Sequence, residues 1–444
     1  MTDELKRTLT AKDVAVITIG TVIGSGIFLT PGTVLKNSGG FVGVSLGVWA
    51  LGGLLTLLGA LAYAELGCMR TGTGGLYVYI RDAFGPVAAF VYGWTLFVVI
   101  ATGSIATLAV AAGDNMTALV PGIGPAARKI VGLLIIGVLA VVNVRGTKES
   151  TKVLAVGTAL KVLALAVLIV VLPFVGSGFS QVTQAMPDHW DGQILTGGLA
   201  GMIGVLWAYE GWQYATFVGG EVQNPQKNFP LGLVVGTLAI VVIYVLANVG
   251  YVAGLGPEAL TRSTTVASDA VGAAFGPTAA KLIAIPVLVS IISACHGLML
   301  TGSRVLFAMS RDGVFFEKLG LIHPKFGTPA NSIIAMAVWG AILALSGTFT
   351  ILLTYVVFVG WIFYGLGGLC VIVFRRREPD APRPFKVPGY PITPILFVAS
   401  AAVIVVNTVI TNPTQGIIGI GGALLGVPIF YFWRSRRKPV PTPQ

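Results

Sequence analysis

The sequence predicts an all-α polytopic membrane protein, and its composition and long apolar runs carry that prediction. Of the 444 residues, 55% are hydrophobic and only 10% are charged, and the mean hydropathy is +0.88. A soluble domain usually carries about 25% charged residues. A chain with so few charges cannot cover its surface with groups that water solvates, so lipid must surround most of it. The 59 glycines fit this class, because small residues let membrane helices approach closely.

Apolar runs long enough to cross a bilayer recur along the whole chain. A helix needs about 20 apolar residues to cross the hydrocarbon core, and reading for such runs predicts twelve transmembrane helices. We expect the eighth to project beyond the bilayer. The predicted spans are 12–36, 41–66, 86–112, 128–145, 150–174, 193–220, 229–254, 277–310, 329–346, 350–374, 392–411 and 414–433.

The positive residues predict the orientation of these spans. Most of the 28 lysines and arginines fall on one side if the N-terminus, the loops from even to odd spans and the C-terminal tail share it. Cytoplasmic loops are enriched in these residues, so we expect both termini to be cytoplasmic. This distribution accounts for the net charge of +11, and no nucleic-acid partner is expected. The tail contributes Arg434, Arg436, Arg437 and Lys438, and the expected outer side carries Lys36, Arg128, Lys129, Arg262 and Lys281.

Two predicted spans contain interruptions. Span 1 carries the glycine-rich run 20–28, and span 6 carries the run 206–213 with Glu210 and Gly211 at its centre. An interrupted helix in a membrane usually lines a cavity. The two spans are five apart, as in two inverted five-helix repeats that each open on a broken helix. We therefore divide the chain into a first repeat (1–190), a second repeat (191–378) and a C-terminal part (379–444).

The two breaks predict a site for a zwitterion. Unwinding at Gly24-Ser25-Gly26 exposes N–H groups at the start of a half-helix, where a carboxylate is favoured. Carbonyl groups freed at Val22 and around 207–210 suit an ammonium group. The alternative explanation of the glycines is helix packing through small residues. The candidate substrate-binding residues in the breaks are Val22, Ile23, Gly24, Ser25, Gly26, Ile27, Trp207, Ala208, Tyr209 and Glu210.

Lys161 is predicted to lie deep in the membrane. It follows Lys152 by nine residues, or roughly 13–14 Å of helix, which is close to the middle of the hydrocarbon core. A charge at that depth costs about 2.5–3.5 kcal/mol on insertion scales, so it should face protein or a cavity. Lys161 is either a fixed cation or a titratable amine beside the broken helices. The alternative is a structural charge satisfied by carbonyl groups.

Three motifs in order resemble the amino acid–polyamine–organocation (APC) superfamily, and the similarity covers nearly the whole chain. Residues 23–28 resemble its first-helix signature, residues 207–230 its sixth helix and following loop, and residues 303–313 the end of its eighth helix. The L-type amino acid transporters and their bacterial relatives are the most similar branch. The resemblance implies the LeuT-like fold of five plus five inverted helices with two C-terminal helices appended. It also implies an integral protein of a bacterial inner membrane.

The resemblance also implies roles for individual residues. Ser25 and Gly26 would bind the substrate carboxylate, and the carbonyl groups of Val22, Trp207 and Glu210 would take its amine. Trp207 would gate the site. Lys161 would lie near Ser290, where sodium-coupled relatives hold sodium, which makes sodium coupling unfavourable. Tyr251 matches a tyrosine near the site in this branch.

The expected function is a sodium-independent exchanger of neutral L-amino acids that works by alternating access. Glu210 leaves open a cationic amino acid or polyamine carrier, and a titrating Lys161 leaves open proton-coupled symport. An amino acid sensor is a further alternative. The loop 113–127 lacks the cysteine that animal members use to bond a glycoprotein partner, so no disulfide-linked heavy chain is expected. The three histidines are far apart and no catalytic cluster is visible, so we expect no enzyme, metal site or cofactor.

Overall fold

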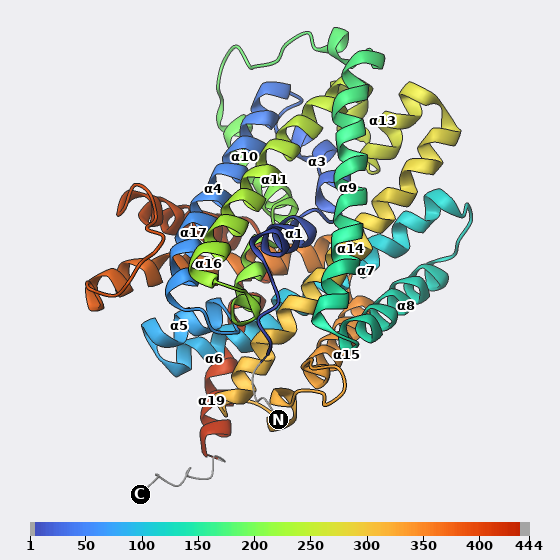
Figure 1. Cartoon of the computed structure of the whole chain (residues 1–444). Helices are drawn as coiled ribbons and strands as arrows, with labels where there is room; N and C mark the ends of the chain where they lie inside the picture. Colours follow the sequence, from blue (N-terminus) through green and yellow to red (C-terminus); the bar gives the residue numbers. More distant parts are fainter. Residues whose placement is uncertain (1–4, 436–444) are drawn as a thin grey trace, which may run out of the picture.

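The computed structural model describes residues 5–435, except for the side chains of 147–149 and 349, and this part of the chain is built from helices. Within it the sole β-type pairing is an isolated parallel bridge between Leu9 and Val222. Figure 1 shows a bundle of helices whose first and last described residues lie on one side, which we call the terminal side. The expected tail cations Arg436, Arg437 and Lys438 lie outside the described residues.

The helices follow the predicted runs closely. The first part of the chain forms α1 (Ala11–Val22), α2 (Gly26–Leu29), α3 (Pro31–Asn37), α4 (Val42–Met69), α5 (Leu76–Phe84), α6 (Pro86–Thr95), a π-helix (Leu96–Ile100), α7 (Ala101–Leu119), α8 (Pro125–Val144), α9 (Thr147–Val175) and a 3₁₀ helix, η2 (Gly178–Gln181). The second part forms α10 (Gly192–Ala208), a 3₁₀ helix, η3 (Trp212–Glu221), α11 (Pro225–Leu255), α12 (Pro257–Arg262), α13 (Val266–Phe275), α14 (Pro277–Arg311), a 3₁₀ helix, η4 (Glu317–Gly320), α15 (Ala330–Ser346), α16 (Phe349–Arg377), α17 (Ile392–Thr411), α18 (Pro413–Leu424) and α19 (Gly426–Ser435).

Eleven helical segments in the described residues are long and apolar enough to cross a membrane. The ninth predicted span, 329–346, corresponds to the shorter apolar helix α15, which has 17 residues and a length of about 25 Å. The first prediction, 12–36, ran through three separate elements, because the chain unwinds after Val22 and turns again before Pro31. The eighth span, α14, has 35 residues and at roughly 52 Å exceeds the hydrocarbon core, as predicted.

Glycines allow α11 to pack directly against the broken helix α1. A Cβ atom on Gly232 would lie 2.5 Å from the carbonyl oxygen of Ala11, and one on Gly236 would lie 2.9 Å from the Cβ of Thr18. The two glycines are four residues apart and share one helix face. This is the small-residue interface that membrane helices use for close approach, and it holds α1 in the middle of the bundle (Figure 1).

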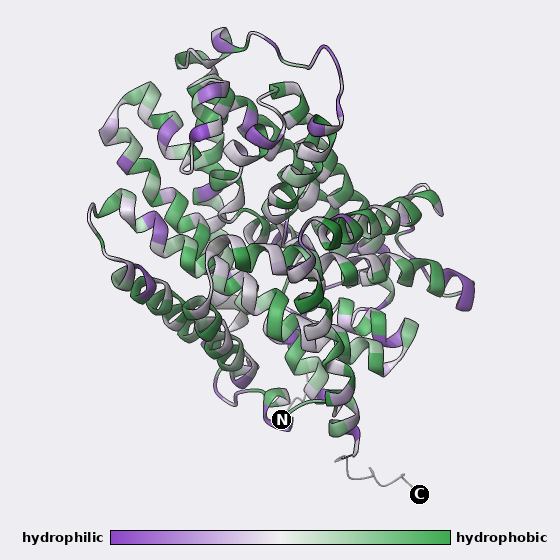
Figure 2. Ribbon diagram, turned by 180° about the vertical axis from the view of Figure 1, so that it is seen from behind, coloured by the Kyte–Doolittle hydropathy of each residue, from purple (hydrophilic) through white to green (hydrophobic). Residues whose placement is uncertain are grey.

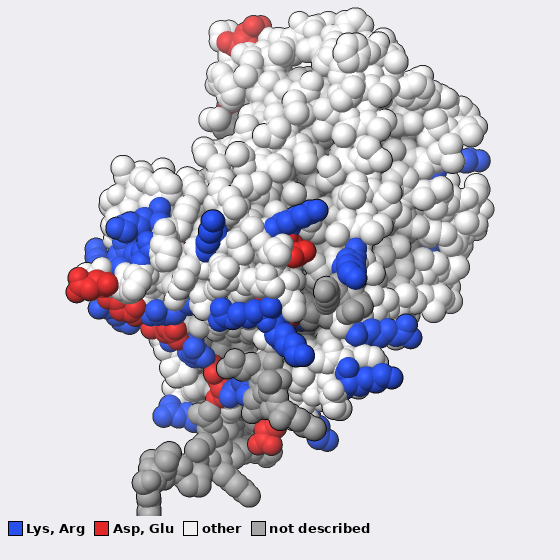
Figure 3. Space-filling model, viewed as in Figure 1, with Lys and Arg blue, Asp and Glu red and all other residues white. Residues whose placement is uncertain are grey.

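The outer faces of the bundle are apolar. Leu134 on α8 and Leu163 on α9 keep 63% and 62% of their surface exposed, and hydrophobic residues cover most of the helices in Figure 2. Figure 3 shows that the basic side chains visible from this face gather mainly on the half that carries the chain ends. An apolar belt beside a basic terminal side is the surface expected of an integral membrane protein.

One ion pair and two backbone hydrogen bonds hold the end of η3 at the terminal side. Arg304 on α14 is fully buried, and its Nε donates to the Glu221 carboxylate at 2.9 Å. The backbone N–H groups of Thr8 and Leu9 donate to the Glu221 carbonyl oxygen at 2.8 and 2.9 Å, beside the Leu9–Val222 bridge. The end of η3 is thereby held by both α14 and the start of the chain.

Candidate substrate site between two broken helices

The first break lies at Ile23–Ser25, between α1 and α2. Ile23 has extended backbone angles (φ −71°, ψ 92°), so the helical hydrogen-bond ladder ends there. The carbonyl groups of the last turn of a helix lack helical partners, and here side chains from other helices supply donors. Ser290 on α14 donates to the carbonyl oxygens of Ile23 and Gly24 at 3.2 and 3.1 Å. The break is therefore held open by the surrounding helices.

Lys161 on α9 caps the end of α1. Its Nζ donates to the carbonyl oxygens of Gly20 and Ile23 at 2.7 and 2.5 Å, and the residue is fully buried. A cation at the negative end of a helix dipole is stabilising. Ser290 shares the Ile23 oxygen with Lys161, so the two predicted coupling residues meet at one carbonyl group.

Tyr244 on α11 contacts the break, and sequence reasoning missed it. Its hydroxyl donates to the Val22 carbonyl oxygen at 3.1 Å, the same carbonyl that was expected to receive the substrate amine. The sequence had singled out Tyr251, two turns further along the same helix face. Tyr251 is fully buried, and its hydroxyl has no hydrogen-bond partner among the described residues. Tyr244 and Tyr251 are both tyrosines in the same apolar helix, so the sequence alone does not distinguish the two positions.

The second break lies at Tyr209–Gly211, between α10 and η3. Gly211 has φ +125°, and a Cβ there would lie 2.8 Å from the carbonyl oxygen of Thr21. The Thr21 hydroxyl donates to the Gly211 carbonyl oxygen at 3.0 Å. A Cβ on Gly26 would lie 2.4 Å from the Cα of Ala208. The two breaks are thus in direct contact, and of the four residues involved the sequence placed Gly26 and Ala208 in the site.

A small cavity of about 20 Å³ lies where the breaks meet. Trp207 lies over it, and its indole Nε1 is 3.4 Å from the Ser25 hydroxyl oxygen. A cavity this size holds about one water molecule, so the site is closed in this conformation. Its lining residues are Thr21, Val22, Gly24, Ser25, Gly26, Ser104, Leu108, Trp207, Glu210, Ala294 and Leu298.

Glu210 lines this cavity, and its carboxylate belongs to a network of polar side chains. Its Oε1 accepts hydrogen bonds from Gln213 Nε2 and from the Tyr364 hydroxyl, both at 2.5 Å. Gln213 Nε2 also lies 2.6 Å from the Tyr364 hydroxyl oxygen. No group among the described residues donates to Oε2. One carboxylate oxygen is therefore fixed by the protein, and the other lacks a donor.

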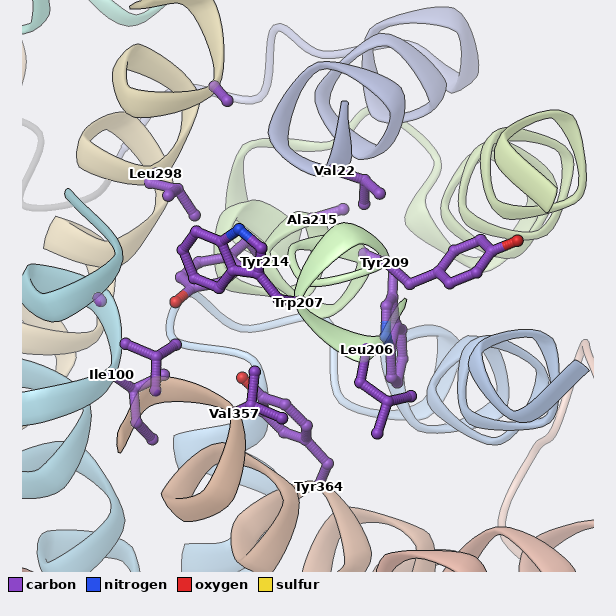
Figure 4. Packing of buried hydrophobic residues seen from close by; sticks show 14 of the residues in the cluster. Val22, Ile100, Leu206, Trp207, Tyr209, Tyr214, Ala215, Leu298, Val357 and Tyr364 are labelled. Carbon is purple, nitrogen blue, oxygen red and sulfur yellow. The ribbon is translucent and has the colours of Figure 1, made fainter. Parts of the chain in front are cut away.

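Several predicted site residues do not line the cavity. Tyr209 points away from Trp207 in Figure 4; its hydroxyl donates to the Trp49 carbonyl oxygen at 3.3 Å, and its ring packs on Tyr244. Ile23, Ile27 and Ala208 are buried in the breaks without lining the cavity, and Tyr251 also lies apart from it. The turn that ends α10 directs the Tyr209 side chain away from the cavity. Matching residues one by one to a sequence motif does not show in which direction a side chain points.

The cavity also contains residues that the sequence did not indicate. Ser104 and Leu108 come from α7, and Ala294 and Leu298 come from α14. These helices are unbroken at the site, and their residues resemble any membrane-helix face. Within the described residues no group of His, Cys, Asp or Glu side chains could hold a metal ion.

Two broken helices that meet around a small closed cavity, inside an apolar helical bundle, define a secondary transporter of the LeuT-like class. The chain belongs to the amino acid permease family, since the model of that family matches residues 9–427. Its relatives are transporters and not enzymes.

Curated relatives match almost the entire chain. The serine/threonine exchanger SteT of Bacillus subtilis is 33% identical over 426 residues, which cover 95% of each chain. The human cystine/glutamate transporter is 34% identical over 442 residues, or 97% of this chain and 86% of that protein. The b(0,+)-type amino acid transporter 1 of Mus musculus is 32% identical over 438 residues, or 97% of this chain and 89% of that protein.

Proposed function

We propose that the protein is a sodium-independent exchanger of neutral L-amino acids that works by alternating access. The observation that carries the proposal is the contact between the two breaks around the cavity, at Gly26–Ala208 and Thr21–Gly211. The relatives named as exchangers and amino acid transporters support it. In this proposal the first and second repeats (1–190 and 191–378) move against each other, and residues 379–444 form an appended part.

The proposed binding mode places the substrate across both breaks. The N–H groups at the start of α2, at Ser25, Gly26 and Ile27, lack helical acceptors and suit the carboxylate. The amine then competes with the Tyr244 hydroxyl for the Val22 carbonyl oxygen, and it also reaches the carbonyl groups of α10 at Trp207 and beyond. Trp207 moves aside to admit the substrate, because the closed cavity of about 20 Å³ is too small for an amino acid.

The position of Lys161 supports sodium independence. Its ammonium group already lies on the Gly20 and Ile23 carbonyl oxygens, with Ser290 on the same carbonyl. A sodium ion would need such oxygens and would be repelled by the fixed charge. Lys161 thus acts in this proposal as a permanent tether between α9 and α1.

Uptake into proteoliposomes tests the proposal. Labelled serine or another neutral amino acid should enter rapidly when the lumen is loaded with amino acid and slowly when it is empty. Replacing sodium by choline should leave the rate unchanged. A steep rise of uptake with sodium, or equal uptake into loaded and empty vesicles, would show that the protein is not a sodium-independent exchanger.

A cationic amino acid or polyamine carrier is the second candidate, and Glu210 favours it. Its Oε2 lacks a donor among the described residues while the side chain lines the cavity. Competition of labelled serine uptake by lysine and by putrescine separates the candidates. Inhibition by neutral amino acids alone supports the first proposal, and strong inhibition by the cations supports the second.

We further propose that the protein lies in a bacterial inner membrane with both termini cytoplasmic, which the basic terminal side supports (Figure 3). It also functions without a disulfide-linked heavy chain. All three cysteines, Cys68, Cys295 and Cys370, are buried, so none is presented to a partner. Labelling of a cysteine introduced at Ser435, in intact cells and in lysed cells, tests the orientation: modification before lysis would contradict it.

A further inference from the structure

A second cleft lies outside the substrate site, on the side away from the chain ends. It has a volume of about 200 Å³ and lies between α7, α8 and α15, which contact one another (Figure 1). Its deeper wall is made of small apolar residues, Ala109, Gly132 and Ala344. Its outer part is polar, because Arg128, Lys129, Asp114 and Thr348 lie nearer the ends of their helices. The cleft is therefore apolar within and charged at its mouth.

Positive charge at this mouth exceeds negative charge. Arg128 and Lys129 lie one turn into α8, whose first turn has no acidic residue. The first turn of α16, which begins after Thr348, has none either. Helix N-termini carry a partial positive charge and favour anions, so two cations there add to an already positive potential. The single carboxylate that lines the cleft is Asp114, which pairs with Arg128 at 3.1 Å and is 55% exposed.

Hydrogen-bond donors remain available at the mouth. Arg128 uses Nη1 for Asp114, and its Nη2 donates to no group among the described residues. Lys129 Nζ donates to the Leu345 carbonyl oxygen at 3.2 Å and retains two further N–H bonds. The Thr348 hydroxyl makes no hydrogen bond within residues 5–435. Cations and free donors around one opening form a site for an oxyanion.

We propose that this cleft binds the phosphate group of an anionic phospholipid. A phosphate accepts from the guanidinium and ammonium groups together, and the small apolar wall accommodates the glycerol part next to it. Ile130 and Leu134 of α8 are 56% and 63% exposed, so the helix that carries the two cations also faces lipid on its other side. A lipid satisfies the apolar wall and the charged mouth of the cleft at once, whereas free phosphate satisfies only the charged part.

The site rests on close packing that positions its two cations. A Cβ on Gly113 would lie 2.4 Å from the Arg128 carbonyl oxygen, and one on Gly132 would lie 2.7 Å from the Ala109 carbonyl oxygen. The start of α8 is thereby pressed against α7. A bound lipid that joins α8 to α15 is expected to stabilise this corner of the bundle.

Native mass spectrometry of the purified full-length protein tests the proposal, with phosphatidylglycerol and phosphatidylcholine as probes. Phosphatidylglycerol should bind in preference. The double variant Arg128→Gln/Lys129→Gln should weaken that binding by about fivefold for each charge removed. The matched control Lys281→Gln removes an exposed cation from α14, expected on the same side, and should bind like the wild type. Equal binding of phosphatidylglycerol by the double variant and the wild type would overturn the proposal.

Asp114→Asn separates lipid recognition from a simple structural role. It breaks the same ion pair as the double variant but removes the one negative charge, so phosphatidylglycerol should bind more tightly. Weaker binding by Asp114→Asn would mean that the ion pair only shapes the cleft, and the assignment would fall. A third arm adds millimolar inorganic phosphate: retention of the lipid supports the phospholipid, whereas its displacement identifies free phosphate as the ligand and contradicts the proposal.

Discussion

The ammonium nitrogen of Lys161 lies 2.5 Å from the carbonyl oxygen of Ile23, and this contact joins an unbroken helix to the start of a break. The same nitrogen lies 2.7 Å from the Gly20 carbonyl oxygen. Two carbonyl groups at the end of α1 are thus satisfied by one side chain from α9. The conformation of the break depends on a residue far from it in the sequence.

Lys161→Ala is expected to destabilise the closed conformation. Hydrogen bonds to charged groups contribute about 1.5–3 kcal/mol, and their loss leaves the end of α1 without a cap. Thermal unfolding should shift to lower temperature, and substrate affinity on the terminal side should fall. The control is Lys152→Ala, which removes an exposed lysine from the same helix.

Uptake across a pH step of one to two units shows whether Lys161 only tethers the helices. A permanently charged tether predicts that wild-type exchange changes little with an imposed proton gradient. Strong acceleration by an inward gradient, lost in Lys161→Ala, would instead identify the lysine as a proton carrier.

Gly26→Ala should abolish transport even though it adds one methyl group. The added Cβ would lie 2.4 Å from the Cα of Ala208, which is backbone and cannot move aside locally. The matched control is Gly47→Ala, since a Cβ on this glycine of α4 meets no atom within 4 Å. Substrate-induced thermal shift and exchange should both disappear in the first variant and persist in the second. Normal exchange by Gly26→Ala would mean that the two breaks separate during the cycle without needing this close contact.

Tyr244→Phe and Tyr251→Phe form a matched pair on one helix. Removal of the Tyr244 hydroxyl takes a hydrogen bond from the Val22 carbonyl oxygen, so stability should fall by about 0.5–1.5 kcal/mol. The Tyr251 hydroxyl has no partner among the described residues, so its removal should be neutral or slightly stabilising. Substrate affinity should change only in Tyr244→Phe. Equal effects of the two substitutions in thermal unfolding and binding would argue against a specific role of Tyr244.

Glu210→Gln should preserve exchange of neutral amino acids. The amide oxygen of glutamine can accept the hydrogen bonds from Gln213 and Tyr364 that Oε1 accepts now. Uptake of serine should remain within about threefold of the wild type, because an isosteric amide loses only the charge. A carrier of cationic substrates would instead lose lysine uptake in this variant, so measuring serine and lysine side by side decides between the two.

Most of the helical spans could be predicted because burial in lipid leaves a strong local signal. The two breaks were also visible, since glycines and polar residues interrupt apolar runs at 20–28 and 206–213. The ends of the first span were not visible, because hydropathy does not register where a helix unwinds. The donors to α1 depend on packing between distant helices. Lys161 could be found because a charge stands out in an apolar run, whereas Tyr244 could not be told from Tyr251.

The bridge between Leu9 and Val222 sets an order of events during synthesis. Residues 5–10 are synthesised before the segment 221–223 that pairs with them, because that segment follows α10 and most of η3. At about 5–20 residues per second, the N-terminal segment waits on the order of 10–40 s for its partner. The first helices of the nascent chain are therefore inserted before the N-terminal segment has its partner. The bridge between Leu9 and Val222 forms only after the second broken helix has entered the bilayer.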